Sequence, residues 1–220
     1  MSTLAVLPVK SFGAAKQRLA EALPGESRRA LAQAMLSDVL GSLGRISSLD
    51  ALVVVTADPE AGAAARSAGA DVVADTEQAG QSPAAKLGIR YGQDRGFGRV
   101  LLVPGDTPLL DPGEVDALLE RAHAEQLGVV VMPDRHGEGT NALLLRPPDA
   151  IEPSFGPGSL ERHVEAARTA GVAHSVEQVP TLMLDIDTGD DLSELVRALE
   201  SSRGRALATQ SALLARAVPA

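Results

Sequence analysis

The chain contains no cysteine. Disulfide bonds, thiolate nucleophiles and cysteine-ligated zinc are therefore excluded. Tryptophan is also absent, and aromatic residues make up only 2% of the 220 residues, so the core must be built from alanine, valine, leucine and isoleucine. A surface that stacks the bases of single-stranded nucleic acid needs aromatic side chains, and this sequence offers very few.

Positive charge is scarce as well. Lysine and arginine number 20 against 29 aspartates and glutamates, which gives a formal net charge of −9. Proteins that bind nucleic acid or anionic membranes through phosphate groups are normally basic, so we expect neither partner. A small phosphorylated anion can still bind to an acidic protein, provided that a local basic patch or a metal ion supplies the positive charge.

Long hydrophobic runs are missing too. No apolar stretch approaches the roughly 20 residues that a membrane-spanning helix needs. The opening sequence MSTLAVLPVKSFGAAK places lysine and proline too early for a signal peptide. We therefore expect a cytoplasmic protein with no membrane partner.

Strand-like and helix-like segments alternate along the whole chain. The apolar runs that indicate strands are residues 4–9, 51–57, 70–75, 99–105, 128–133, 142–147 and 181–187. Helical patterns lie between and after these runs, at residues 27–43, 59–69, 112–126 and 159–171, and after Ser82-Pro83 and Thr188. This alternation predicts an α/β fold with a mainly parallel sheet covered by helices on both faces. No linker-like stretch interrupts it, so we expect one domain over residues 1–220, with 201–220 as a terminal helix or tail.

Three of the helix starts share one device. Asp58-Pro59, Ser82-Pro83 and Asp111-Pro112 each place a polar residue just before a proline. Such a residue can accept hydrogen bonds from the first backbone N–H groups of a helix, and proline is well suited to the first helical position. We therefore predict that Asp58, Ser82 and Asp111 are helix caps.

Carboxylates follow two of the predicted strands, at the edge where open parallel sheets bind ligands. Asp106 follows the run 99–105 in LLVPGDTPLL, and Asp185 and Asp187 end the run 181–187. Two residues apart in a strand, Asp185 and Asp187 would point the same way and repel each other unless a cation lies between them. Together the three side chains predict a Mg²⁺ site. Taken singly, Asp106 could belong to a turn, and Asp185 and Asp187 could cap the helix after Thr188.

A basic loop follows the first predicted strand. Lys10, Lys16 and Arg18 surround the small residues 13–15, which would let a ligand come close. Such a loop can cradle a triphosphate, although the Walker A pattern is absent. The alternative is a solvated helix face.

Two glycine-rich loops flank the run 142–147. HGEGTN (136–141) contributes the hydroxyl of Thr140, and SFGPGS (154–159) contributes Gly156 and leads into a helix at Ser159. Backbone N–H groups at a helix N-terminus favour a phosphate or carboxylate. The alternative is a pair of ordinary turns, with Ser159 as a helix cap.

Among the four histidines only His136 lies in a candidate site, and we expect His163 at the surface or at a helix edge.

Five stretches, in the same order from about residue 4 to residue 199, carry a family resemblance: LPVKSFGAAKQRLA, VPGDTPLL, GTNALLLRP, FGPGSLERH and LDIDTGDDL. Together they resemble the phosphoenolpyruvate/2-phospho-L-lactate guanylyltransferases, which make the guanylylated precursor of coenzyme F-420. The resemblance implies a three-layer α/β/α architecture with a mostly parallel mixed sheet, the nucleotide-diphospho-sugar transferase or glycosyltransferase-A-like fold.

The resemblance also implies roles for individual residues. Two Mg²⁺ ions would be held by Asp106, Asp185 and Asp187, which with Lys16 form the expected catalytic set. The phosphate and carboxylate of the acceptor would contact Thr140, Gly156 and Ser159. The triphosphate of GTP would face Lys10, Lys16 and Arg18. The family usually has an asparagine in a GLNAAL-like helix start, where this chain reads AGQSPAAKLG (79–88), so Ser82 is expected near the nucleotide.

The expected reaction joins GTP and phosphoenolpyruvate, releasing pyrophosphate. No covalent nucleophile is needed, because a phosphate monoester is already ionised at neutral pH and positioning with charge neutralisation can suffice. The acceptor could instead be 2-phospho-L-lactate, and the Ala/Gly/Arg-rich composition favours phosphoenolpyruvate only by likeness to the actinobacterial branch. The sequence also leaves open a molybdenum-cofactor or sugar-phosphate nucleotidyltransferase and a non-catalytic nucleotide-binding module. An unstable product would favour hand-over to the next enzyme of the pathway.

Overall fold

The computed structural model describes residues 1–14, 16–202 and 204–216. Residue 15 of the small-residue stretch and residues 203 and 217–220 of the predicted tail lie outside the described residues. The described strands form one seven-stranded sheet with the order β3-β2-β1-β4-β6-β5-β7. Their bounds are β1 (Thr3–Val9), β2 (Ala51–Thr56), β3 (Asp71–Ala74), β4 (Arg99–Leu102), β5 (Val129–Pro133), β6 (Thr140–Leu145) and β7 (His174–Val176).

The sheet is parallel except at one strand. β1 pairs in parallel with β2 and β4, β2 with β3, and β5 with β7, whereas β6 runs antiparallel between β4 and β5. The central strands β4, β5 and β6 are buried along their whole length, as expected for near-continuous apolar runs with helices on both faces. The mostly parallel mixed sheet that the sequence predicts is confirmed.

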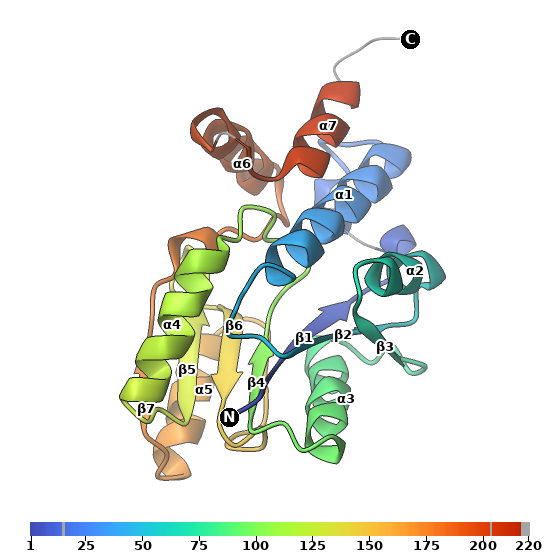
Figure 1. Ribbon diagram of the computed structural model, residues 1–220. Helices are drawn as coiled ribbons and strands as arrows, with labels where there is room; N and C mark the ends of the chain where they lie inside the picture. The colour runs from blue at the N-terminus through green and yellow to red at the C-terminus, as the bar shows by residue number, and fades with distance from the viewer. Residues whose placement is uncertain (15, 203, 217–220) are drawn as a thin grey trace.

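Helices cover both faces of this sheet (Figure 1). The core on one face is formed with α1 (Gly25–Leu43), α2 (Pro59–Ser67) and α4 (Pro112–Ala124). The core on the other face is formed with α3 (Gln81–Asp94) and α5 (Ser159–Thr169). The three-layer architecture is therefore also confirmed.

A third apolar cluster holds the C-terminal part of the chain. It joins α1 to α6 (Gly189–Ser201), and α7 (Leu207–Arg216) also lies beside α1 (Figure 1). The Asp38 carboxylate fixes the start of α7 by accepting from the backbone N–H groups of Ala208 and Thr209, at 3.1 and 2.8 Å. Of the two alternatives left open for residues 201–220, a helix or a tail, the described part contains the helix α7.

Two of the three predicted helix caps are confirmed. Asp58 accepts from backbone N–H groups in the first turn of α2, and Asp111 does the same for α4. The prediction for Ser82 is wrong, because α3 begins one residue before it, at Gln81, and Gly80 is the cap. Gly80 has a φ of 118°, which glycine adopts readily, so the chain enters α3 at this residue.

The predicted strand at residues 181–187 is also wrong. This segment contains the 3-10 turn η3 (Pro180–Leu182) and then irregular backbone, and the seventh strand is the short β7 before it. The apolar side chains that suggested a strand serve two different clusters. Leu182 packs in the apolar cluster that includes α1 and α4, and Ile186 packs in the cluster that includes α1 and α6. Burial of alternate apolar residues therefore imitated a strand pattern.

Within the described ranges, no helix combines the length and the apolar character needed to cross a bilayer.

Close packing of α3 against β1 generates a stability prediction. A Cβ atom at Gly88 would lie 2.1 Å from Val6 Cγ1. Gly88→Ala is therefore expected to lower the free energy of unfolding by about 1–3 kcal/mol, through overpacking of the core, as measured by urea denaturation. Gly41→Ala is the matched control, because its Cβ would meet nothing within 4 Å. That change should raise the stability by about 0.5–1 kcal/mol, and equal midpoints for both variants would contradict the packing argument.

Candidate active site

The loop after β1 is anchored by a carboxylate from the next βα unit. Asp58 Oδ2 accepts from the backbone N–H of Phe12 at 2.9 Å, and Oδ1 accepts from Glu60 and Ala61 in the first turn of α2. Burial alone would raise the pKa of Asp58, but these backbone hydrogen bonds outweigh it and the pKa is lowered. Asp58 therefore stays ionised while it joins the basic loop to α2.

Lys16 lies at the centre of the candidate site. Its backbone has a φ of 57°, a left-handed conformation that costs free energy for a residue with a side chain and often marks a functional position. The ammonium group bonds to Asp106 Oδ2, and it lies 3.0 Å from Asp187 Oδ1. Only 8% of the Lys16 side chain is exposed. One ammonium thus joins the loop after β1, the loop after β4 and the segment before α6.

The charges in this group support one another. Burial alone would lower the pKa of Lys16, but the carboxylates of Asp106 and Asp187 outweigh burial and raise it. Burial alone would raise the pKa of Asp187, but the Lys16 ammonium outweighs burial and lowers it, and Arg18 and Lys10 act in the same direction. The predicted gathering of the basic loop and the carboxylates is therefore present in the fold. The Lys10 and Arg18 side chains are exposed at its edge.

Asp185 lies in a different electrostatic environment from Asp187. Burial, followed by the negative charge of Asp106, raises the pKa of Asp185 to about 6, although a hydrogen bond from Asn141 acts the other way. Asn141 Nδ2 donates to Asp185 Oδ1 at 3.1 Å and to the Leu182 carbonyl at 2.8 Å. Sequence reasoning missed Asn141, although a buried amide in an apolar strand needs partners and is a usable signal.

Neither Asp185 nor Asp187 caps the following helix. The start of α6 is held by a capping box, in which the Thr188 hydroxyl accepts from Asp191 N and the Asp191 carboxylate accepts from Thr188 N. The capping alternative for Asp185 and Asp187 is therefore wrong. The expectation that strand geometry aligns them is wrong too, because this segment is irregular and their partners differ.

Asp106, Asp185 and Asp187 have the donor atoms of a metal site. Carboxylate oxygens are the hard donors that Mg²⁺ and Mn²⁺ prefer, so the chemistry of the donor set fits a divalent ion. Across residues 1–14, 16–202 and 204–216, no group of three or more His, Cys, Asp and Glu side chains is arranged to hold a metal ion. The positive charge beside Asp106 and Asp187 is the Lys16 ammonium. Metal binding by Asp106, Asp185 and Asp187 stays a prediction.

The two glycine-rich loops meet through backbone and hydroxyl groups. The N–H of Thr140 donates to Ser159 Oγ at 2.8 Å, and both residues are buried. Ser159 is the first residue of α5, and the cap is Gly158, so the alternative that Ser159 caps the helix is wrong. Gly156 has a φ of 112°, a conformation that favours glycine. The N–H of Ser159 donates to the Gly156 carbonyl at 3.0 Å, so the structure brings Thr140, Gly156 and Ser159 together, while their contact with a substrate stays a prediction.

The expectation for His163 is wrong, because its side chain is fully buried. The backbone N–H of Ser154 donates to His163 Nε2 at 2.8 Å, and Nδ1 lies 2.9 Å from Thr140 Oγ1. Burial and then the charge of Arg162 lower the pKa of His163 to about 4. Ser159, His163 and Ala167 are the buried residues of α5, and their spacing of four residues is the helical signal that could have placed His163 on the inner face.

His136 has a neighbouring residue as its partner, whereas Ser82 has a partner far away along the chain. The carboxylate of Asp134 shapes the loop after β5 by accepting from the N–H groups of residues 136, 138 and 139. His136 is exposed and its Nε2 lies 3.2 Å from Arg135 Nε. Ser82 Oγ accepts from the N–H of Phe155 at 2.8 Å, so it joins α3 to the loop before α5. A nucleotide contact of Ser82 stays a prediction.

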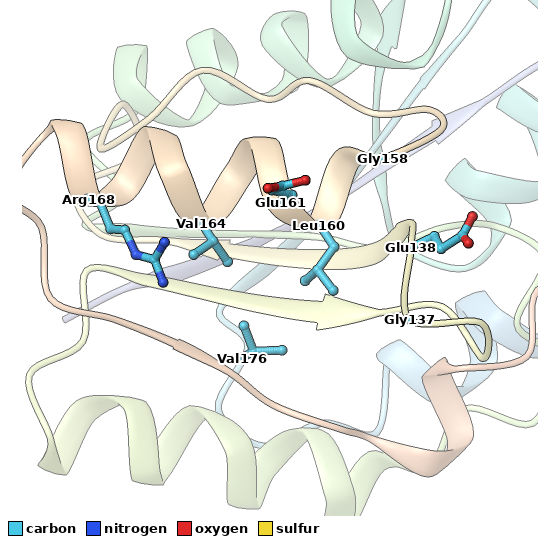
Figure 2. A pocket seen from close by; sticks show the side chains of 8 residues that line it. All are labelled: Gly137, Glu138, Gly158, Leu160, Glu161, Val164, Arg168 and Val176. Carbon is cyan, nitrogen blue, oxygen red and sulfur yellow. The ribbon is translucent and has the colours of Figure 1, made fainter.

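A groove of about 410 Å³ lies between α5 and β7. Figure 2 shows Leu160 and Val164 of α5 opposite Val176 of β7, with Glu138 near one end and Arg168 near the other. Gly137 and Gly158 also line it, but the predicted catalytic, metal and substrate residues do not. The groove is therefore separate from the side chains gathered around Lys16.

The family model and the most similar relatives both indicate guanylyltransferases. The family model for "Guanylyl transferase CofC like" matches residues 3–206. The phosphoenolpyruvate guanylyltransferase of Conexibacter woesei is 47% identical over 213 residues, which cover 97% of this chain and 96% of that protein. The 2-phospho-L-lactate guanylyltransferase of Methanothermobacter thermautotrophicus is 35% identical over 205 residues, which cover 93% of this chain and 89% of that protein.

Solved structures share the fold at lower identity. A crystal structure described as a nucleotide-diphospho-sugar transferase from Desulfovibrio desulfuricans has a TM-score of 0.77 at 20% identity, covering 97% of this chain and 94% of that one. A Mycobacterium tuberculosis protein crystallised in complex with manganese has a TM-score of 0.55 at 20% identity, covering 90% of this chain and 100% of that one. These likenesses confirm the predicted nucleotide-diphospho-sugar transferase fold.

The raised pKa of Asp185 generates a pH-dependent prediction. Its folded pKa of about 6 lies above the ordinary value of 3.8, so the wild type loses stability as the pH rises through this window. Asp185→Asn removes the buried charge and should raise the free energy of unfolding at pH 7 by about 1–3 kcal/mol, since one pKa unit corresponds to about 1.4 kcal/mol. The gain should be small at pH 4, as measured by chemical denaturation at both pH values.

Asp190→Asn is the control for this prediction, because Asp190 is exposed in the first turn of α6. Its effect on the free energy of unfolding should be small at both pH values. An equal effect of Asp185→Asn at pH 4 and pH 7 would contradict the assigned cause.

Proposed function

This chain belongs to the family of CofC-like guanylyl transferases, which are nucleotidyltransferases, and on that premise we propose that it transfers the GMP group of GTP to phosphoenolpyruvate. The products are enolpyruvoyl-2-diphospho-5'-guanosine and pyrophosphate, in a step of coenzyme F-420 biosynthesis. The observation that carries the proposal is the convergence of Lys16 with Asp106, Asp185 and Asp187 beyond the carboxyl ends of β1 and β4. Open parallel sheets bind their ligands at this edge.

The proposed chemistry is a displacement at phosphorus. An oxygen of the acceptor phosphate attacks the α-phosphorus of GTP, the bond from that phosphorus to the bridging oxygen breaks, and pyrophosphate leaves with the electron pair. Both reactants are anions, so their approach requires neutralisation of charge and fixed orientation. Lys16, Lys10 and Arg18 supply positive charge at this edge. A phosphate monoester is ionised at neutral pH, so the reaction needs no cysteine and no general base.

The proposed cofactor is magnesium, with two ions held by Asp106, Asp185 and Asp187. Support comes from the hard oxygen donors of these side chains and from the manganese complex of a structural relative. When bound there, a divalent ion would neutralise phosphate charge and stabilise the leaving group. Lys16 and the metal would then compete for the carboxylates of Asp106 and Asp187. An ammonium released from these carboxylates could face the triphosphate.

The proposed acceptor site is the junction of β6 and α5. Thr140 and Ser159 offer hydroxyls there, Gly156 keeps the backbone open to a ligand, and the N-terminus of α5 favours an anion. Phosphoenolpyruvate and 2-phospho-L-lactate both carry a phosphate and a carboxylate. The names of several relatives favour phosphoenolpyruvate, and one relative is named for 2-phospho-L-lactate.

The direct test is pyrophosphate release. Purified protein is incubated with GTP and Mg²⁺, together with phosphoenolpyruvate in one reaction and 2-phospho-L-lactate in another. We expect the higher kcat/KM with phosphoenolpyruvate. A preference for 2-phospho-L-lactate would correct the acceptor, and the lack of turnover with either would overturn the proposed function.

Two substitutions test the residues that carry the proposal. Lys16→Met and Asp106→Asn should each lower kcat at least about 100-fold, a typical effect of removing a charge-stabilising group from an active site. Asp94→Asn is the matched control, because Asp94 is an exposed residue at the end of α3. The control should keep full activity. Near-normal kcat in both site variants would remove the support for this catalytic group.

A further inference from the structure

His163 is a fully buried, polar side chain that the proposed chemistry does not use. Both of its ring nitrogens have partners. The N–H of Ser154 lies 2.8 Å from Nε2, and Thr140 Oγ1 lies 2.9 Å from Nδ1. Thr140 belongs to the proposed acceptor site, so His163 lies directly behind a group expected to contact the substrate.

The partner on one side of the ring fixes the tautomer. A backbone N–H can only donate, so His163 Nε2 must accept from Ser154 and carries no proton. In a neutral imidazole the proton then lies on Nδ1, and Nδ1 donates to Thr140 Oγ1. The pKa of His163, lowered to about 4 by burial and then by the charge of Arg162, keeps the ring neutral near pH 7.

This tautomer decides what the Thr140 hydroxyl can offer to a ligand. Thr140 Oγ1 accepts from His163, so its own O–H remains available to donate. Ser159 Oγ likewise accepts from the N–H of Thr140, so its O–H also remains available. In the described part of the chain, neither of these hydroxyls has a hydrogen-bond acceptor.

We propose that His163 is a positioning residue for the acceptor: its Nδ1–H holds Thr140 in the donor state, so that Thr140 and Ser159 present paired O–H donors to an anionic group. The role of that group as the substrate's phosphate or carboxylate rests on the proposed function. Ionised phosphate and carboxylate oxygens only accept hydrogen bonds, so they match two donors. In the opposite tautomer, the unprotonated Nδ1 would accept a hydrogen bond from the Thr140 O–H, and the hydroxyl would turn its lone pairs toward the anion.

A purely structural role for His163 makes different predictions. The loop before α5 also depends on Arg162, whose Nη2 donates to the Ser154 carbonyl at 2.8 Å, and on Ser82, which accepts from Phe155. The ring of His163 packs edge-on against Phe155, with 5.3 Å between centroids. If His163 only held this loop in place, its removal would raise KM for both substrates and would also lower the free energy of unfolding.

The first test measures the tautomer of His163 directly and does not depend on enzymatic activity. Nitrogen-15 NMR of protein labelled at histidine distinguishes a protonated from an unprotonated ring nitrogen. We expect His163 to be neutral at pH 7, with a protonated Nδ1 and an unprotonated Nε2. His163→Phe identifies its signals by their loss. A ring protonated at Nε2, or at both nitrogens, would overturn the inference.

The second test separates positioning from structure. His163→Phe keeps a ring but removes the donor, and it should raise KM for phosphoenolpyruvate about 10- to 100-fold with little change in kcat or in KM for GTP. In a Thr140→Val background, the same His163→Phe change should cause no further rise, because His163 acts through Thr140. An equal further rise, or a matching rise in KM for GTP, would assign His163 a structural role.

His163→Asn keeps a hydrogen-bond donor for Thr140 but removes the acceptor for Ser154. Its amide can donate from near the position of Nδ1, but it cannot reach Ser154 as Nε2 does. It should therefore keep KM for phosphoenolpyruvate well below that of His163→Phe. Equal KM values for the two variants would show that the contact with Ser154 matters instead, and would overturn the inference.

Failure of the inference and failure of the proposed function are distinguishable. If the wild type has an Nδ1-protonated His163 but releases no pyrophosphate, the proposed function is overturned, whereas the assigned tautomer is confirmed. Turnover by a protein whose His163 is protonated at Nε2 overturns only the inference.

Discussion

The ammonium of Lys16, held between the carboxylates of Asp106 and Asp187, is the interaction on which the site depends. Three segments that are far apart in sequence meet at this group. Without a cation, the carboxylates of Asp106, Asp185 and Asp187 would repel one another, and a buried ammonium without carboxylates would carry a large desolvation cost. The left-handed backbone at Lys16 is consistent with a position held by its surroundings.

Two consecutive residues join this charged group to the proposed acceptor site. Asn141 donates to Asp185, and the N–H of Thr140 donates to Ser159 at the start of α5. The start of the antiparallel strand β6 therefore contacts both halves of the site. Carboxylates that could hold metal lie on one side, and hydroxyl donors suited to an anion lie on the other. This arrangement suits a reaction that brings two phosphorylated reactants together.

Sequence patterns predicted most of the sheet because its central strands are continuous apolar runs with helices on both faces. The caps Asp58 and Asp111 followed from local chemistry that needs no tertiary contact. The segment 181–187 was misread because its apolar side chains fill two clusters, a fact that only the fold reveals. His163 and Asn141 were missed for a related reason, since His163 contacts Thr140 and Asn141 contacts Asp185, and both partners are distant along the chain.

We propose that Asp106 and Asp187 hold Lys16 in the free protein and would hold a divalent ion in the working enzyme. A Mn²⁺ titration of the nucleotide-free wild type and of Lys16→Met, followed by electron paramagnetic resonance, tests this exchange. Removing the ammonium removes both a competitor and a repelling charge, so Lys16→Met should bind Mn²⁺ more tightly than the wild type. Equal or weaker binding by Lys16→Met would contradict the claim.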